Sequence, residues 1–233
     1  MVTGSGQQNR DEEIFEHKPF AVIADALARA GIATLRYDDR GFSGYKGNIN
    51  DCTTEDFKND ALAGVELLRT RFDKVGVIGH SEGGTIALML AAEQKVDFVV
   101  SLAGMVISGA ETLVWQNKVA LQGSGLTNEQ IDSYCKMLEK AFDVRAHGGR
   151  MPDPDDYDVP EVLMQNYWAV VAQIQMPYMI HFLRLDMRPL LGNVTCPVLA
   201  LNGTKDVQVE YESNLSALHN TLPSNSKNQI ESV

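Results

Sequence analysis

The sequence predicts an α/β fold in which a mostly parallel sheet is flanked by helices and carries a helical cap insertion. Three observations predict it: short apolar runs recur along the chain, helical patterns separate them, and glycine, proline or aspartate bounds most of the runs. Continuous apolar runs of this length suit strands that are buried on both faces of a parallel sheet. The alternation of such runs with helices is typical of an α/β sandwich.

The individual elements follow from local patterns. The expected strands cover residues 32–37, 75–79, 96–104 and 197–203. The first helix, PFAVIADALARAG, has Pro19 near its start and Gly31 just past its end, the asymmetry that helices favour. The second begins at Thr53 or Thr54, with acidic residues in its first turn that complement the helix dipole. A third helix follows Ser81.

The alternation stops between Met105 and Asn193, where helical segments follow one another without a strand pattern. An insertion of this size predicts a cap over the sheet edge at which open α/β folds bind ligands. We therefore expect a core of residues 1–104 and 194–233 and a cap of residues 105–193. The side chains that either line a pocket under the cap or pack cap helix on cap helix are Trp115, Met137, Met164, Tyr167, Trp168, Met176, Tyr178, Met179 and Phe182.

Composition and charge exclude some classes of function. A chain of 233 residues, 44% of them apolar, fits one folded domain with an inserted subdomain. Its formal net charge of −11 repels phosphate backbones, so no nucleic-acid partner is expected. No apolar run reaches the roughly 18 residues of a membrane span. The segment MVTGSGQQNRDEE lacks the basic and apolar regions of a signal peptide, which leaves the cytoplasm as the default location.

No cofactor or metal is expected. The three cysteines, Cys52, Cys135 and Cys196, have no spacing typical of a disulfide framework or a metal site. The chain has no cluster of histidine and cysteine ligands and no glycine fingerprint for nucleotides. The chemistry must therefore come from its side chains and backbone.

The segment GHSEGG, residues 79–84, follows an apolar strand and precedes an alanine-rich helix. A serine at such a sharp turn has its hydroxyl lifted clear of the sheet edge, and bulky residues at Gly79 or Gly83 would clash across the turn. We interpret Ser81 as a nucleophile and the N–H of Glu82 as an oxyanion donor. The Glu82 side chain is expected to lie in solvent. The alternative is an ordinary turn with a helix cap, since glycine and serine are common in turns.

Asp206 follows the strand run PVLALNG, which places it at the same sheet edge as Ser81. A carboxylate at that edge can hold an imidazole in the correct tautomer and stabilise its charged form. The alternative is a loop aspartate that caps a turn.

Four stretches resemble the α/β-hydrolase superfamily, and within it the bacterial esterases and serine-aminopeptidase-like hydrolases. They are VTGSGQQNRDEE (residues 2–13), RYDDRGFSGYKG (36–47), GHSEGG (79–84) and CPVLALNGTKDVQV (196–209). The resemblance implies a serine hydrolase that cleaves carboxylic esters through an acyl-enzyme, with Ser81 as nucleophile and Asp206 as triad acid. The substrate it implies is a small ester or a short peptide.

The same resemblance assigns the loop around TGSG to the second oxyanion donor. We assign this backbone N–H to Ser5, with Gly4 and Gly6 as the neighbouring choices; the alternative is a flexible terminus. The residues Asp38, Asp39 and Arg40 are expected to form buried ion pairs that fix the loop beside the turn at Ser81.

The sequence assigns no base to Ser81. The histidines are His17, His80, His147, His181 and His219. In the family the triad histidine follows one more strand, and NSKNQIESV resembles the start of that strand, which would put the base beyond Val233. MVTGSG likewise resembles the tail of the third strand. We therefore expect an internal piece of a hydrolase, truncated at both ends and nearly inactive as it stands. Its exposed sheet edges favour a homo-oligomer.

Two other functions compete with the esterase. An aminopeptidase needs an acidic group to hold the substrate ammonium, and the candidates in the cap are Glu111, Asp153, Asp155 and Asp156. The third interpretation is a catalytically impaired fragment or a non-catalytic binding protein.

Overall fold

A computed structural model describes residues 1–42 and 44–233. Its centre is a four-stranded parallel sheet with the order β1-β2-β3-β4. The strands are β1 (Val77–His80), β2 (Val99–Leu102), β3 (Val198–Asn202) and β4 (Gln229–Ser232). The first three lie within or next to apolar runs of the sequence, and β4 lies in NSKNQIESV. The α/β fold with a parallel sheet is thereby confirmed.

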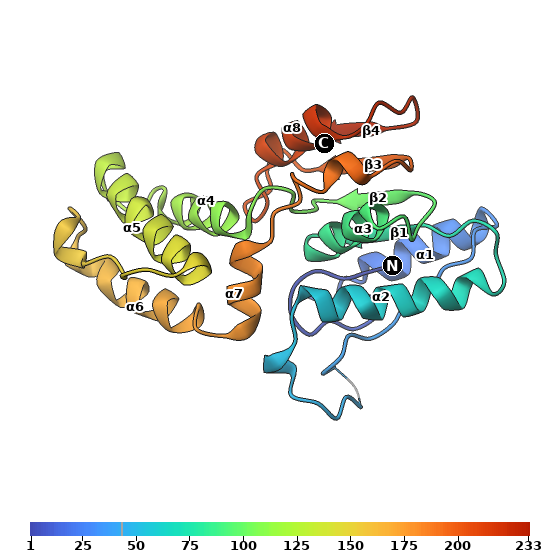
Figure 1. The fold of residues 1–233 in the computed structure, drawn as a ribbon, viewed down its shortest axis with the longest axis horizontal. Coiled ribbons are helices and arrows are strands. Elements are labelled where there is room, and N and C mark those ends of the chain that lie inside the picture. The colour runs from blue at the N-terminus through green and yellow to red at the C-terminus, as the bar shows by residue number, and fades with distance from the viewer. Residues whose placement is uncertain (43) are drawn as a thin grey trace.

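Helices flank this sheet (Figure 1). Those of the core are α1 (Pro19–Arg29), α2 (Thr54–Arg69), α3 (Glu82–Ala92) and α8 (Tyr211–Thr221), with short 3-10 helices η1 (Ile49–Asp51) and η4 (Leu191–Asn193). Helix α3 packs on β1 and β2, α2 packs on α3, and α8 packs on β3 and β4. Thr53 caps α2 through a reciprocal pair of bonds with Asp56, and Gly31 beyond α1 has φ +78°. Both helix boundaries agree with the sequence patterns.

The expected strand at residues 32–37 is wrong. A strand is defined by hydrogen bonds to a neighbour along its length. Among the described residues, the only partner that this stretch finds across the sheet is Met1, whose amino group donates to Leu35 O over 2.8 Å. The N-terminal segment that lies beside residues 32–37 is itself hardly a strand, because its Val2 forms a single parallel bridge with Gly79 of β1. The stretch is not fully buried either, since Ile32 and Ala33 are exposed and residues 34–37 are partly buried, and no ladder forms there in the described part of the chain.

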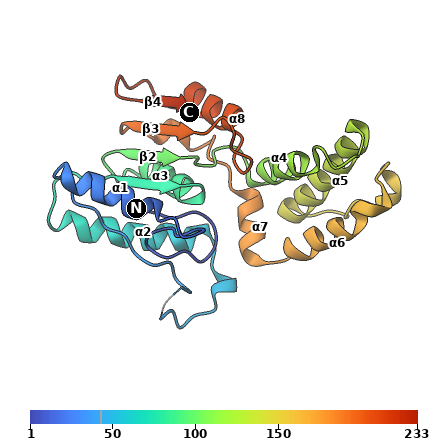
Figure 2. The ribbon, with the colours of Figure 1, turned by 180° about the vertical axis from the view of Figure 1, so that it is seen from behind.

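The helices between β2 and β3 lie to one side of the sheet, and Figure 2 shows the same separation from behind. They are α4 (Gly109–Leu121), α5 (Asn128–His147), α6 (Met164–Gln173) and α7 (Pro177–Arg184), with 3-10 turns η2 (Pro154–Asp156) and η3 (Glu161–Leu163). They have their own apolar cluster, which includes Tyr134, Met137, Phe142 and Tyr167. Phe182 of α7 packs against both this cluster and the main core.

The chain enters and leaves the cap through two segments that are bonded to each other. Met187 N–H donates to Val106 O over 3.0 Å, and Gly109 N–H donates to Leu185 O over 2.9 Å. The cap is therefore one continuous excursion of the chain whose two ends meet at a single point of the core.

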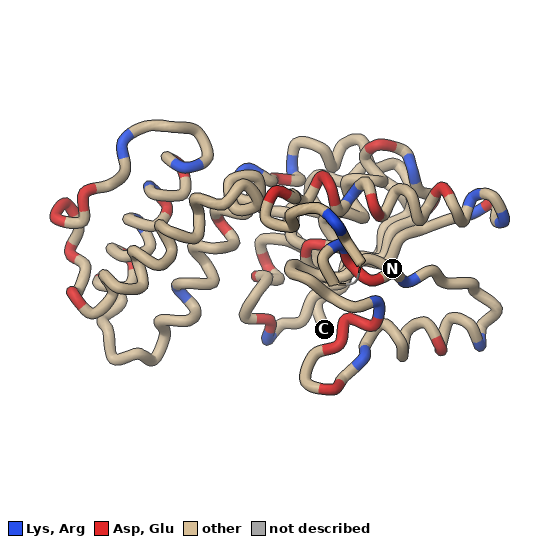
Figure 3. Tube along the Cα trace, turned by 90° about the horizontal axis from the view of Figure 1, so that it is seen from below, with Lys and Arg blue, Asp and Glu red and all other residues tan. Residues whose placement is uncertain are grey.

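Acidic and basic residues are interspersed along both parts of the molecule, as Figure 3 shows. Within the part of the chain that the structure describes, no helix combines the length and the apolar character that crossing a membrane requires.

Candidate active site

Ser81 lies at the junction of β1 and α3 with φ 52° and ψ −120°. A positive φ is unusual for a residue with a side chain, and it persists only where the surroundings enforce it. Here the enforcement is close packing. A Cβ at Gly79 would lie 1.9 Å from Gly83 O, and a Cβ at Gly83 would lie 2.2 Å from Val2 O. The N–H of Ser81 is also fixed, because it donates to Leu102 O at the end of β2.

Ser81 and Asp206 line the same cleft, which has a volume of about 580 Å³. Its core side consists of the turn at Ser81, the N-terminal loop, the start of α1, the end of β2 and the loop after β3. Its cap side consists of α4 and α7 and the end of α6. The apolar lining includes Phe20, Ile23, Met105, Leu113, Met179 and Phe182. Of the cap residues expected to line a pocket, Tyr178, Met179 and Phe182 do so, whereas Met137 and Tyr167 pack inside the cap.

Asp206 occupies the turn that follows β3. Its Oδ1 accepts the N–H groups of Gln208 and Val209 over 2.8 and 3.0 Å, and its Oδ2 accepts Asn202 Nδ2–H over 3.3 Å. The carboxylate is half-buried and fixed by its own turn. It thus has the local bonds of a turn cap and also borders the cleft that contains Ser81.

The loop of residues 4–12 borders the cleft next to Ser81. Gly4 N–H donates to Glu12 Oε1 over 2.7 Å and is therefore occupied. Among the described residues, the N–H groups of Ser5 and Glu82 have no hydrogen-bond acceptor. Both residues line the cleft. Two amides that need a partner thus lie on the loop and on the helix that flank the serine.

Glu12 also binds His80, the residue before the serine. His80 Nδ1 lies 2.7 Å from Glu12 Oε1, and Glu12 is buried. This bond raises the pKa of His80 above its usual value, against the opposing effect of burial. His80 is also the one histidine among the described residues that lines the cleft. Because its Nδ1 is engaged on the loop, the His80 ring ties residues 4–12 to the turn at Ser81.

The other four histidines lie away from the serine. His147 pairs with Asp143 over 3.0 Å, and His219 is exposed on α8. His17 precedes α1 and His181 lies on α7, and neither contributes to the cleft lining in the described part of the chain. No hydrogen bond joins any of these rings to Ser81 or Asp206 among the described residues.

The expectation that the Glu82 side chain lies in solvent is wrong. Only 3% of this residue is exposed, and its carboxylate accepts hydrogen bonds from Thr54 Oγ1 (2.6 Å) and Tyr178 OH (2.8 Å). Burial and the neighbouring Glu82 charge raise the pKa of Tyr178 above its usual range. An acid in the first turn of a helix is ordinarily solvated. Glu82 is buried because a cap residue 96 positions away covers it.

The ion pairs expected for residues 38–40 are found in part. Arg40 pairs with Asp60 over 2.5 Å, and Asp38 pairs with Arg10 over 2.8 Å, although Arg10 is largely exposed. Asp39 differs, because among the described residues it has no cationic partner.

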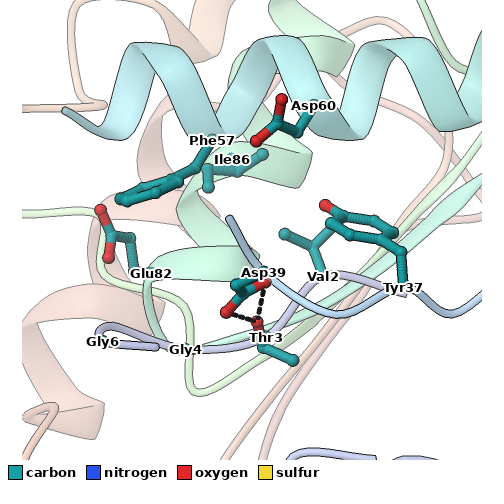
Figure 4. A pocket seen from close by; sticks show the side chains of 10 residues that line it. All are labelled: Val2, Thr3, Gly4, Gly6, Tyr37, Asp39, Phe57, Asp60, Glu82 and Ile86. Carbon is teal, nitrogen blue, oxygen red and sulfur yellow. Dashed lines mark hydrogen bonds between the residues drawn. The ribbon is translucent and has the colours of Figure 1, made fainter. Parts of the chain in front are cut away.

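Instead, the Asp39 carboxylate accepts Thr3 Oγ1–H, as the dashed lines of Figure 4 show, and the N–H of Gln8. Burial raises the pKa of Asp39 to about 6. Asp39 therefore fixes the start of the loop through neutral donors.

Comparisons with known proteins identify the family of the chain. Residues 16–231 match the family model described as serine aminopeptidase, S33. Esterase EstD of Thermotoga maritima is 29% identical over 211 residues, which are 90% of this chain and 46% of that protein. An acyl transferase of Photobacterium leiognathi is 34% identical over 89 residues, 37% of this chain and 29% of the relative. The chain spans less than half the length of each of these curated relatives.

Among solved structures, the α/β hydrolase GrgF from Penicillium sp. sh18 resembles the chain with a TM-score of 0.58 and 15% identity. The match covers 100% of this chain and 79% of that one. At this identity the likeness shows the fold alone.

Proposed function

Because this chain belongs to the serine aminopeptidase S33 family, within the α/β-hydrolases, we propose that it hydrolyses carboxylic esters by nucleophilic acyl transfer. The observation that carries the proposal is one arrangement in one apolar cleft. It combines a serine with a positive φ, a carboxylate fixed by its own turn, and two amide N–H groups that find no acceptor among the described residues.

Each group has a role in the proposed reaction. Ser81 Oγ attacks the ester carbonyl carbon while its proton passes to an imidazole that Asp206 holds. The N–H groups of Glu82 and Ser5 donate to the oxyanion of the tetrahedral intermediate. The intermediate expels the alcohol, which takes the proton from the imidazolium. Water then attacks the acyl-enzyme by the same steps and releases the acid.

The imidazole itself is assigned to none of the five histidines of this chain. Of the histidines in the described part of the chain, only His80 lines the cleft, and its Nδ1 is bonded to Glu12. Without an imidazole in place, serine hydrolases retain only about 10³–10⁴-fold catalysis over water. We therefore expect the 233-residue chain to react slowly.

The cleft favours an ester over an aminoacyl substrate. An aminopeptidase needs an accessible carboxylate to bind the ammonium group of its substrate. Glu111 is bonded to Arg188 over 2.6 Å and borders a different cavity. Asp153, Asp155 and Asp156 do not contribute to the lining of the cleft in the described part of the chain. The carboxylates that do line the cleft, those of Glu12, Glu82 and Asp206, already accept hydrogen bonds from the protein, and much of the remaining lining is apolar, which suits an uncharged acyl chain.

Chemical rescue tests the proposal. If the reaction needs an imidazole between Ser81 and Asp206, imidazole added from solution should restore part of the activity. Hydrolysis of p-nitrophenyl butyrate is measured at rising imidazole concentration, with Ser81→Ala as the blank for catalysis by free imidazole. We expect a Ser81-dependent rate that increases with imidazole and is strongly reduced in Asp206→Asn. A fluorophosphonate probe, read by mass spectrometry, should label Ser81 with the same imidazole dependence.

Other results would point elsewhere. Equal rates for the wild-type chain and Ser81→Ala at every imidazole concentration would contradict the esterase. Rapid labelling without imidazole would show that one of the five histidines serves as the base. Faster turnover of aminoacyl nitroanilides than of esters would favour the peptidase, and ligands that raise the melting temperature without turnover would favour a binding protein.

A further inference from the structure

The residue after the nucleophile carries a buried carboxylate with no counter-ion. Glu82 is 3% exposed, and among the described residues no Lys, Arg or His forms an ion pair with it. A buried charge is costly unless hydrogen bonds compensate it. The two hydroxyl donors of Thr54 and Tyr178 and the positive end of the α3 dipole supply that compensation. Removing either donor leaves part of the charge without a partner.

The two donors come from different parts of the molecule. Thr54 is the first residue of α2 in the core and is fully buried. Tyr178 lies on α7 of the cap, where its ring also packs against Phe57 of α2 and Phe182 of α7, with centroid distances of 6.4 and 6.0 Å. Figure 4 shows the Glu82 carboxylate beside the Phe57 ring. One carboxylate thus joins α2, α3 and α7.

We propose that Glu82 and Tyr178 form a latch that holds cap helix α7 against the turn at Ser81 and thereby fixes the backbone N–H of Glu82. The amide and the anchored carboxylate belong to the same residue, so a shift of α7 displaces an oxyanion donor directly. Tyr178 also lines the cleft, and the same helix therefore sets the cleft wall. The catalytic part of this inference rests on the proposed function, whereas the structural part does not.

The charge itself argues for a positioning role. A carboxylate near a developing oxyanion opposes the negative charge that forms there, so Glu82 is not a direct electrostatic stabiliser of the intermediate. What the carboxylate offers is two short hydrogen bonds from elements that are far apart in sequence. Glu82 and Tyr178 are accordingly positioning residues.

The test compares Tyr178→Phe with a matched control. Tyr134→Phe also removes a buried cap hydroxyl, one that accepts a hydrogen bond from Asn166 over 2.6 Å, but it lies on α5 in the interior of the cap. Hydrogen–deuterium exchange is followed for residues 177–184, and labelling of Ser81 by a fluorophosphonate is measured with added imidazole. For Tyr178→Phe we expect about tenfold faster exchange in α7, because hydrogen bonds to charged groups are the stronger ones.

The labelling kinetics separate positioning from simple loss of structure. In Tyr178→Phe the maximal labelling rate should fall several-fold while the probe concentration for half-saturation changes little. In Tyr134→Phe we expect both quantities to stay at the wild-type values and any faster exchange to be confined to α5 and α6. If Tyr178→Phe does not fold, Thr54→Val removes the other donor without altering the cap and should produce the same two effects.

Unchanged exchange of α7 in both Tyr178→Phe and Thr54→Val would overturn the latch. Faster exchange with an unchanged maximal labelling rate would overturn the link to the oxyanion donor. If the wild-type chain is not labelled even with imidazole, the proposed function fails and the catalytic part of the inference fails with it. The exchange data then decide the structural part on their own.

Discussion

Replacing Gly79 with alanine tests whether the turn at Ser81 depends on the absence of a side chain before it. The added Cβ would lie 1.9 Å from Gly83 O, 2.2 Å from Gly83 C and 2.6 Å from Gly84 N. All three are backbone atoms, so no rotation of a side chain relieves the overlap. Because carbon atoms in contact are about 3.5–4.0 Å apart, β1 and α3 must separate by more than about 1 Å.

The expected losses of stability and of reaction rate follow from that displacement. Overpacking costs about 1–3 kcal/mol, and an overlap of backbone with backbone places Gly79→Ala at the upper end, about 3 kcal/mol. A misplacement of about 1 Å in a reacting group can lower the rate about 10²-fold. Urea denaturation gives the free energy of unfolding, and imidazole-dependent labelling of Ser81 gives the reactivity. Gly192→Ala is the control, because nothing lies within 4 Å of its added Cβ.

We expect Gly192→Ala to match the wild-type chain in both assays, within about 0.5 kcal/mol. A Gly79→Ala variant with wild-type stability and wild-type labelling would refute the reasoning. Such a result would mean that a Cβ fits between β1 and α3 despite the close contact between Gly79 and Gly83.

Two further predictions concern protonation. The Glu12–His80 bond raises the pKa of His80 above 6.5, so its contribution to stability is present below that pH and is lost as the pH rises through the folded-state value. Glu12→Gln should therefore lower the His80 pKa in an NMR titration and destabilise the chain more at pH 5 than at pH 9; equal losses at both values would contradict this. Asp39, with a pKa raised from 3.8 to about 6, binds a proton more tightly in the folded chain, so the free energy of unfolding should fall as the pH rises through this interval. Asp39→Asn should flatten that part of the profile from urea denaturation, and a profile parallel to the wild type would show that Asp39 does not cause the slope.

Local patterns predict most of the sheet and the turn at Ser81, because apolar runs, helix caps and glycine spacing depend on nearby residues. The stretch at residues 32–37 has the composition of a strand but forms no ladder with any described segment. Glu82 has the sequence position of a solvated acid, and only the return of the chain at Tyr178 buries it. Asp39 forms no ion pair with any described residue, because its carboxylate accepts hydrogen bonds from Thr3 and Gln8 instead. Each of these differences between prediction and structure depends on a contact with a residue that is distant in sequence. Composition and periodicity do not reveal such contacts.

The paired bonds between Val106 and Met187 and between Gly109 and Leu185 bring the two ends of the cap to one place. A segment whose ends are already joined can be exchanged for another of different length at a small entropic cost, since that cost grows only slowly with the number of residues enclosed. Grafting the equivalent segment of a relative between these two bonds should therefore leave the fold of the core intact, whereas the turn at Ser81 should keep its geometry only where the graft supplies a hydroxyl donor in place of Tyr178. The cap can thus vary in length and sequence at little cost to the core, but Tyr178 makes one of its helices part of the reacting turn, so the two cannot diverge fully independently.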